Sequence, residues 1–348
     1  MSTTSEEQVV QANGLSQSAV EASAAQAAPW APPQRSFFGQ FPAAVRAMRP
    51  KQWTKNGLVL LALVFARKLT DVPSVERAVL AFFAFSLAAS TVYIINDIAD
   101  REKDRLHPKK RRRPIASGQL SLPFAGVTAL LCAAGATALT YVLAVRDLSG
   151  LPDPFLKWGG SPLLFSATLG GYVVMNLAYS TWLKHQVLWD VFIIAAGFVL
   201  RALAGAFAIP VPISPWFYLC TTFLALFLAL GKRRAELVQL SAGAASHRRN
   251  LREYTLQLLD QLMAVVVTCT LMSYSLYTFQ GVDASHALML TIPFVVFGLF
   301  RYMYLIYVKG DGDQPDELLY RDKQILGAVV LCVLVIAGVL YGLPLLQR

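Results

Sequence analysis

Charged side chains are scarce in this chain of 348 residues: they make up 15% of it, whereas hydrophobic residues make up 55%. This is the composition of a membrane protein. Cysteine and histidine are also rare, with four residues of each type. Neither type stands at the spacing of a metal-ligand cluster or of a histidine-based catalytic triad. The chemistry is therefore expected to depend on other side chains.

Long hydrophobic runs, in contrast, recur along most of the chain. A transmembrane helix needs about 20 apolar residues to cross a hydrocarbon core of about 30 Å, and about nine windows approach this length. They are 57–74, 76–97, 121–145, 160–182, 187–208, 215–231, 258–280, 287–308 and 324–346. The first is the weakest, because Arg67 and Lys68 interrupt it. The sequence predicts an all-α integral membrane protein, a bundle of about nine transmembrane helices.

Lysine and arginine fall mostly on one side of this predicted bundle. With the N-terminus inside, 23 of the 31 basic residues lie in the cytoplasmic segments. Those segments are 1–56, 98–120, 183–186, 232–257 and 309–323. By the positive-inside rule we expect a multi-pass protein of the plasma (inner) membrane whose charged, cytoplasm-facing cavity forms the site. The net charge of +10 then reflects topology and an anionic substrate, and we expect no nucleic-acid partner.

The first part of the chain differs from the rest. Residues 1–35 are rich in alanine, glutamine, serine and glutamate, and they lack the apolar core of a signal peptide. We therefore expect residues 1–40 to be a disordered cytoplasmic tail and residues 41–348 to form one intramembrane domain.

The densest charge follows the second hydrophobic run. If its helix continues, Asp97, Asp100 and Asp104 stand at i, i+3 and i+7 and share one face. The outer two are roughly 10 Å apart along the helix. Such a row, with Asn96 adjoining, suits one or two Mg2+ ions, which bind a few carboxylates together with substrate phosphate oxygens. The pattern predicts a magnesium–diphosphate site in which the three aspartates are catalytic.

Basic residues flank this acidic row. Lys110 and Arg113 lie in a basic run directly after it, and Lys51 and Lys55 stand four residues apart before the first span. Basic runs beside membrane helices commonly only set topology or contact anionic lipid. The functional alternative is that these side chains bind the phosphate groups of a substrate.

The short connection between the fourth and fifth spans holds a second polar group, formed by Tyr179, Lys184 and Asp190. An acid inside a membrane span is costly and indicates a functional site. Asp190 could bind a second cation or orient Lys184. Arg201, on the same helical face, lies roughly 16 Å deeper; we expect it to have a buried structural partner or to reach toward the far side.

Two later segments complete the candidate site. At the end of the sixth span, Lys232 or Arg233 can pair with Glu236 at helical spacing. The loop that follows could close over a bound ligand. Arg321 precedes the ninth span, where it either faces the same cavity or only adds charge at the helix end.

Together these motifs resemble the UbiA prenyltransferase superfamily. Its first signature, Asn-Asp-x-x-Asp-x-x-x-Asp, matches residues 96–104, and its second site matches Tyr179, Lys184 and Asp190. Within the superfamily the chain is most similar to the decaprenyl-phosphate phosphoribosyltransferase branch of actinobacterial cell-wall synthesis. The segments that carry this similarity are 49–56, 107–116, 183–186, 231–237 and 321–322.

The resemblance implies transfer of 5-phosphoribosyl from phosphoribosyl diphosphate to a polyprenyl (decaprenyl) phosphate, with release of diphosphate, for arabinogalactan precursors. It implies Mg2+ held by Asn96, Asp97, Asp100 and Asp104. The residues expected to bind substrate are Lys51, Lys55, Lys110, Arg113, Tyr179, Lys184, Asp190, Lys232, Arg233, Glu236 and Arg321. Many members carry a second Asp-x-x-x-Asp motif, but here Gln186 stands four residues before Asp190. This departure fits a lipid substrate with a single phosphate.

Two other functions remain open at this stage. One is a UbiA-type prenyltransferase that moves an isoprenoid from its diphosphate to an aromatic or quinone precursor; a second pair of aspartates would favour it. The other is a transporter or lipid flippase, for which internal repeats and helices broken at the midplane are expected. The sequence sets no oligomeric state, and a homo-oligomer such as a trimer is compatible with it.

Overall fold

The computed structural model describes residues 36–107, 110–146, 162–209, 211–241, 251, 253–280, 286–312, 317–318 and 321–342. Its elements in this part of the chain are all helices, and eight are long and apolar enough to cross a membrane. The predicted all-α membrane fold is therefore confirmed. Residues 1–35 of the expected tail lie outside the described part.

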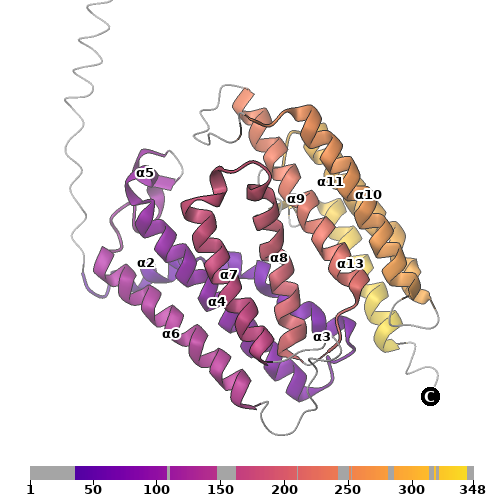
Figure 1. Ribbon diagram of the computed structural model, residues 1–348, viewed down its shortest axis with the longest axis horizontal. Helices are drawn as coiled ribbons and strands as arrows, with labels where there is room; N and C mark the ends of the chain where they lie inside the picture. The colour runs from indigo at the N-terminus through magenta and orange to yellow at the C-terminus, as the bar shows by residue number, and fades with distance from the viewer. Residues whose placement is uncertain are drawn as a thin grey trace, which may run out of the picture.

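The long helices follow one another with alternating direction (Figure 1). They are α4 (Val72–Ala99), α6 (Leu122–Arg146), α7 (Pro162–Thr181), α8 (Trp189–Ala208), α9 (Pro215–Ser241), α10 (Leu256–Gln280), α11 (Ile292–Tyr307, preceded by the 3-10 turn Ala287–Thr291) and α13 (Lys323–Ala337, extended by the π-turn Gly338–Gly342). The shorter ones are α2 (Gln40–Ala47), the 3-10 helix η1 (Pro50–Leu60), α3 (Leu61–Phe65), α5 (Arg101–Leu106), η2 (Lys110–Arg112) and η4 (Leu183–His185).

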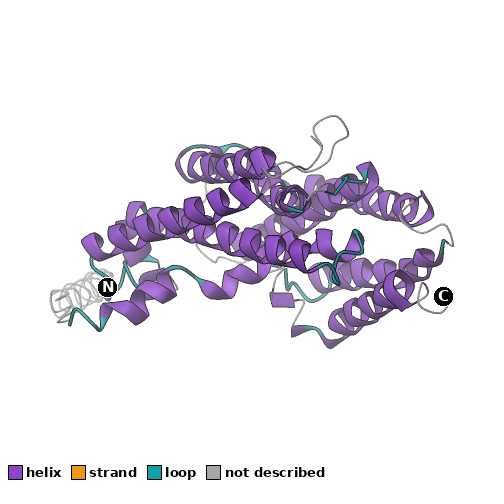
Figure 2. Ribbon diagram, turned by 90° about the horizontal axis from the view of Figure 1, so that it is seen from below, coloured by secondary structure: helices purple, strands orange, loops and turns teal. Residues whose placement is uncertain are grey.

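Helix α8 joins the two halves of the bundle. Its first half packs into a hydrophobic cluster with α9, α10, α11 and α13. Its second half packs into another cluster with α4, α6, α7 and η1. The view from below shows helices running along the length of the molecule (Figure 2). Because α8 contributes to both clusters, the position of its N-terminus is tied to both halves.

The segment expected as the first span, 57–74, has a different structure. Two short helices lie here instead, η1 followed by α3, from Pro50 to Phe65. A 3-10 helix rises about 2.0 Å per residue against about 1.5 Å for an α-helix, so this segment spans roughly 30 Å, the thickness of a hydrocarbon core. The eight candidate spans found in the described part of the chain do not include this segment, so the ninth expected span is not confirmed.

Polar contacts hold η1 against α4. Residues three apart lie on one side of a 3-10 helix, and Trp53 and Asn56 use this spacing. The Trp53 Nε1–H donates to Ser90 Oγ at 3.1 Å, and the Asn56 amide donates to Ser86 Oγ at 3.0 Å. These bonds fix the helix that carries Lys51 and Lys55.

Arg201 is buried in the middle of the bundle and has a structural partner, as one of the two expectations stated. Its guanidinium donates to Asn56 Oδ1 at 2.8 Å, to the Gly197 carbonyl at 2.6 Å and to Tyr172 Oη at 2.8 Å. In the described part of the chain no carboxylate lies within ion-pair distance of it. Neutral oxygens and the nearby Tyr172 ring therefore stabilise this charge.

Candidate active site

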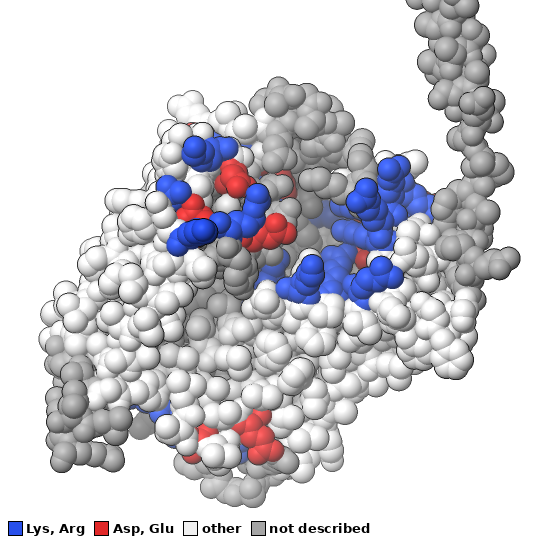
Figure 3. Space-filling model, turned by 180° about the vertical axis from the view of Figure 1, so that it is seen from behind, with Lys and Arg blue, Asp and Glu red and all other residues white. Residues whose placement is uncertain are grey.

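The predicted site residues gather at one end of the bundle, called here the polar end. It is formed by the C-terminal ends of α4, α7, α9 and α11 and the N-terminal ends of α8, α10 and α13. Figure 3 shows basic side chains on two sides of a hollowed surface, with acidic side chains among them. Charges from segments far apart in the sequence therefore face a common region.

The helix that carries Asp97 does not continue unbroken through the acidic row, so the condition for one shared helical face is not met. Helix α4 ends at Ala99, Asp100 has φ −91° and ψ 7°, and α5 begins at Arg101. Asp97 and Asp104 are nevertheless brought together, because Arg113 Nη1 lies 3.0 Å from Asp97 Oδ1 and 2.7 Å from Asp104 Oδ2. Asp97 and Asp104 share a basic partner, as residues on one face would.

Asp100 has different partners from the other two acids. Its carboxylate lies 3.8 Å from Lys184 Nζ and 4.0 Å from Lys103 Nζ. Lys184 belongs to η4, the short helix between α7 and α8. The acidic row is thus the place where the two predicted polar groups of the sequence meet.

Arg49 completes the charge balance of the row. Its guanidinium donates to Asp97 Oδ1 and stacks over the Tyr93 ring at 4.9 Å. Asp97 is 2% exposed and Asp104 3% exposed, and buried carboxylates are tolerated only when cations compensate them. Two arginines and two buried acids form a neutral group. Arg49 was not among the predicted substrate-binding residues, since its partner stands 48 positions away.

The donor chemistry of this row fits Mg2+, although a ready-made cage is absent. In the described ranges no three histidine, cysteine, aspartate or glutamate side chains form a group that could hold a metal ion. Mg2+ is usually bound through only one or two carboxylates plus substrate phosphates. Asp97 and Asp104 supply such oxygens, and the guanidinium groups beside them show that the site already stabilises positive charge. The half-buried Asn96 adjoins the row.

The second polar group is a buried ion pair. Asp190 is wholly buried and Arg233 is 1% exposed, with Asp190 Oδ2 2.8 Å from Arg233 Nε. Arg233 also contacts Glu236, which confirms the predicted pairing at helical spacing. Of the two possibilities stated for Asp190, orientation of Lys184 is not supported by an ion pair between them, because Lys184 pairs with Asp100.

Tyr254 is a site residue that sequence reasoning missed. Its hydroxyl donates to Asp190 Oδ1 at 2.7 Å and accepts from the Leu188 backbone N–H at 2.7 Å. Burial, and then the hydrogen bond to Asp190, raise the pKa of Tyr254. The phenol therefore keeps its proton at neutral pH and acts as the donor. No local pattern marks this tyrosine, which precedes α10.

The remaining predicted residues line the polar end at different depths. Lys51 and Arg321 are exposed, whereas Lys55, Lys110, Tyr179 and Lys232 are half-buried. Arg321 Nη1 lies 4.0 Å from Asp311. Its neighbour Asp322 caps α13 by accepting hydrogen bonds from the backbone N–H groups of the next turn, so this pair of residues serves the helix end at least in part.

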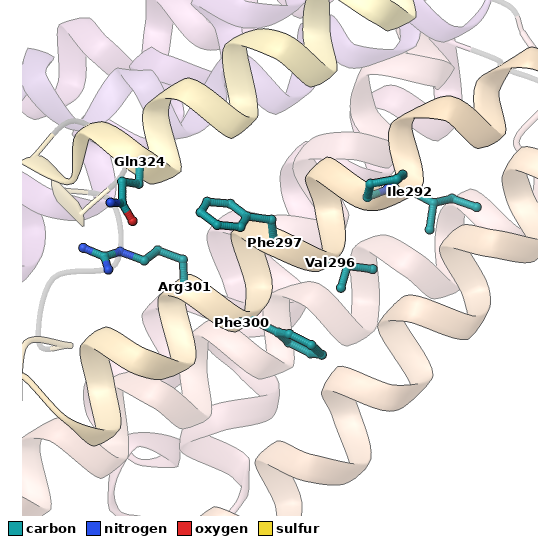
Figure 4. Close-up of a pocket in the computed structure, with 7 residues that line it drawn as sticks. Ile292, Val296, Phe297, Phe300, Arg301 and Gln324 are labelled. Carbon is teal, nitrogen blue, oxygen red and sulfur yellow. The ribbon is translucent and has the colours of Figure 1, made fainter.

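A cavity of about 540 Å³ lies elsewhere, between α11 and α13. Figure 4 shows Arg301 and Gln324 at one end and Ile292 at the other, with Phe297 between the helices. Arg301 is paired with Asp322 at 2.8 Å. The lining is otherwise apolar, and none of the predicted site residues contributes to it. The acidic row therefore remains the candidate site.

Comparison with known proteins identifies the family of this chain. The model of the UbiA prenyltransferase family matches residues 57–321. The chain is 35% identical over 288 residues to the decaprenyl-phosphate phosphoribosyltransferase of Mycobacterium tuberculosis, covering 80% of this chain and 88% of that protein. It is 33% identical over 309 residues to the protein of the same name from Corynebacterium glutamicum, covering 86% and 87%.

The fold has counterparts among solved structures. A UbiA homolog from Archaeoglobus fulgidus bound to DMAPP and Mg2+ matches with a TM-score of 0.61 at 18% sequence identity, covering 85% of this chain and 96% of the other. At this identity the match concerns the fold. The family match covers most of the chain, and relatives at 33–35% identity span most of its length. The chain belongs to the UbiA prenyltransferase family.

Proposed function

We propose that this protein transfers the 5-phosphoribosyl group of phosphoribosyl diphosphate to a polyprenyl phosphate such as decaprenyl phosphate, and releases diphosphate. The observation that carries the proposal is the neutral group of two buried aspartates and two arginines at the polar end. It offers carboxylates for a metal and guanidinium groups for phosphates at one place. The names of the relatives at 33–35% identity support the same reaction.

The reaction would take place at the cytoplasmic face of the plasma membrane, with the N-terminus on the same side. The concentration of basic residues in the segments at the polar end supports this orientation. The polyprenyl chain would remain in the bilayer, and its phosphate would approach the acidic row from the membrane surface. Phosphoribosyl diphosphate, which is water-soluble, would enter from the cytoplasm.

The protein's own groups would bind and orient the donor. Asp97, Asp100 and Asp104, assisted by Asn96, would hold Mg2+, which supplies Lewis-acid stabilisation of the diphosphate leaving group. Arg113 and Lys184 now contact these same carboxylates. Both are therefore within reach of phosphate oxygens that bind beside the acids. Fixed cations at a developing negative charge stabilise the transition state more than the ground state.

The bond between C1 of the ribose and the diphosphate oxygen breaks, and its electron pair leaves with diphosphate. A bond forms between C1 and an oxygen of the lipid phosphate, through an oxocarbenium-like state typical of glycosyl transfer. A phosphate monoester has a second pKa of about 6 and is largely dianionic at pH 7, so the nucleophile needs no general base. In the described part of the chain, the ion pairs of Asp97 and Asp104 are with arginine, and those of Asp100 are with lysine.

The buried second group supports this reaction over transfer of an isoprenoid from its diphosphate. The Asp190 carboxylate already forms an ion pair with Arg233 and accepts a hydrogen bond from Tyr254. Replacing these partners by a second cation would leave Arg233 buried beside a metal ion, which is unfavourable. A single metal–diphosphate site matches a donor with one diphosphate and a lipid acceptor with one phosphate.

The proposal is tested by incubating purified protein with Mg2+, radiolabelled phosphoribosyl diphosphate and decaprenyl phosphate. We expect label in the lipid fraction and free diphosphate, loss of both with EDTA, and recovery when Mg2+ is added in excess. A parallel reaction with an isoprenyl diphosphate and an aromatic acid should give no product. Prenylation of the aromatic acid, or no turnover of any of these substrates, would contradict the proposal. Turnover that survives EDTA would remove the metal from it.

Lys184→Met is expected to raise KM for phosphoribosyl diphosphate by about 10- to 100-fold, because a hydrogen bond to a charged group contributes about 1.5–3 kcal/mol. Lys103→Met is the matched control: Lys103 is also near Asp100, but its side chain is 84% exposed, and exposed pairs contribute about 0–1 kcal/mol. Steady-state kinetics in the transfer assay measure both. Equal effects of the two substitutions would contradict a role for Lys184 in donor binding.

A further inference from the structure

We propose that Tyr254 is a positioning residue: it holds the turn before α8 in its strained conformation and thereby keeps Lys184 beside Asp100. The inference rests on the proposed function, because it concerns how the donor-binding lysine is placed. It adds a residue of the segment just before α10 to those that shape the site. Three observations carry it: the backbone of the turn, the contacts of one hydroxyl group, and the short path from the turn to Lys184.

The turn before α8 has an unfavourable backbone conformation. Leu188, the residue that precedes Trp189, has φ 66° and ψ −41°. Positive φ is uncommon for residues other than glycine, and a bulky side chain makes it less favourable still. Strain of this kind persists only where the surrounding structure holds it, and it concentrates at functional sites.

One hydroxyl group holds the turn from both sides. The Leu188 N–H donates to Tyr254 Oη at 2.7 Å, and Tyr254 Oη donates to Asp190 Oδ1 at 2.7 Å. The other oxygen of Asp190 lies 2.8 Å from Arg233 Nε. Tyr254 is 4% exposed, so little water reaches it to replace these bonds. The tyrosine thus connects the strained backbone to a buried ion pair between α8 and α9.

The turn leads directly to the acidic row. Lys184 lies four residues before Leu188 in η4, and its amine is 3.8 Å from Asp100. The backbone N–H of Asp190 donates to the Gln186 carbonyl at 3.3 Å, so a backbone hydrogen bond spans the turn that contains Leu188. If Leu188 relaxes to negative φ, the chain before it must change direction. Lys184 then loses its place at the row while the acids themselves stay where they are.

A purely structural role makes a different prediction for the same residue. The Tyr254 ring packs in the hydrophobic cluster of α8–α11 and α13, and phenylalanine would fill the same space. If the ring alone matters, Tyr254→Phe changes nothing at the acidic row. If the hydroxyl matters, the turn is released although the core stays packed.

Tyr254→Phe is therefore expected to raise KM for phosphoribosyl diphosphate about tenfold. We expect kcat to stay within about threefold of wild type and KM for decaprenyl phosphate to stay unchanged. A tenfold change is the size expected when one hydrogen bond is lost. Combined with Lys184→Met, it should cause little further loss, because both act through the same contact. Tyr254→Phe together with Leu188→Gly should recover much of the donor KM, since glycine adopts positive φ without help.

Tyr274→Phe is the matched control. It removes the hydroxyl of a tyrosine in α10, which hydrogen-bonds Thr291 at 2.6 Å, away from the acidic row. It should leave both KM values unchanged. Hydrogen–deuterium exchange of the peptide that contains residues 183–190 gives a readout independent of turnover: it should quicken in Tyr254→Phe and not in Tyr274→Phe.

Unchanged exchange and unchanged donor KM in Tyr254→Phe would overturn the proposal. So would fully independent effects of Tyr254→Phe and Lys184→Met, or the absence of any recovery with Leu188→Gly. If exchange is faster in Tyr254→Phe but the wild-type protein transfers no phosphoribosyl group, then Tyr254 does hold the turn and the proposed function is wrong. The two failures are thus distinguishable.

Discussion

Asp97→Asn is expected to lower kcat/KM for phosphoribosyl transfer by about 100- to 1,000-fold, a typical loss when a group that stabilises transition-state charge is removed. Asparagine keeps the size of the side chain and one acceptor oxygen, but it removes the negative charge. Asp97 accepts from both Arg49 and Arg113, so the substitution also leaves two guanidinium groups without their shared partner. Asp104→Asn should have an effect of similar size, because Asp104 shares Arg113.

Glu102→Gln is the control for these two variants. Glu102 stands between them in sequence and is also a carboxylate of the polar end, but its side chain is 71% exposed and pairs with Arg105. Its removal should change activity by less than about threefold, since exposed ion pairs contribute little. The measurement is the rate of label transfer to decaprenyl phosphate, with thermal unfolding and size-exclusion profiles to establish folding. Folded Asp97→Asn protein with normal turnover would remove this acid from the mechanism.

Gly205→Ala is expected to destabilise the protein by about 3 kcal/mol or more, at the upper end of the range for overpacking. A Cβ atom at Gly205 would lie 2.0 Å from the carbonyl oxygen and 2.8 Å from the carbonyl carbon of Val59. These are backbone atoms of η1, so no side chain can rotate away. Helix η1 must therefore move away from α8. This helix follows Arg49 directly and contains Lys51.

Gly170→Ala is the matched control for this prediction, because the space around a Cβ atom at Gly170 is open. In the interior of α7, alanine should stabilise by about 0.5–1 kcal/mol relative to glycine. The midpoint of thermal unfolding in detergent should fall clearly for Gly205→Ala and stay level or rise for Gly170→Ala. Equal midpoints would show that η1 does not pack against α8 at this distance.

The long helices could be predicted from the sequence because their signal is local. A window of about 20 apolar residues indicates a span regardless of its neighbours, and α4 and α8 lie close to where such windows placed them. The segment made of η1 and α3 could not be predicted this way. It contains Lys51 and Lys55, and its 3-10 geometry depends on Ser86 and Ser90 of another helix.

In the site, too, the local features could be predicted and the tertiary contacts could not. The density of charge was enough to identify Asp97, Asp100 and Asp104 as a candidate group. Their partners are tertiary: Arg49 reaches Asp97 across 48 positions, and Lys184 reaches Asp100 from another connection. The break of the helix at Asp100 is equally absent from the sequence pattern, which favours an unbroken helix.

Tyr254 was beyond sequence reasoning for a further reason. Its hydroxyl contacts Leu188 and Asp190, 66 and 64 positions away, and tyrosine in a segment before a membrane helix is ordinary. The proposed role of the hydroxyl rests on the positive φ of Leu188. Neither leucine nor its sequence neighbours indicate that the backbone adopts this conformation. Such contacts become visible when the chain has folded.

The proposed function depends above all on the acidic row at the end of α4 receiving the diphosphate of the donor. A cryo-EM map of the full chain with Mg2+ and phosphoribosyl diphosphate, without acceptor, tests it most directly. We expect the diphosphate beside the carboxylates of Asp97, Asp100 and Asp104, metal density between them, and Arg113 turned onto a phosphate oxygen. Donor density elsewhere, with Asp97 and Asp104 still sharing Arg113, would contradict the claim.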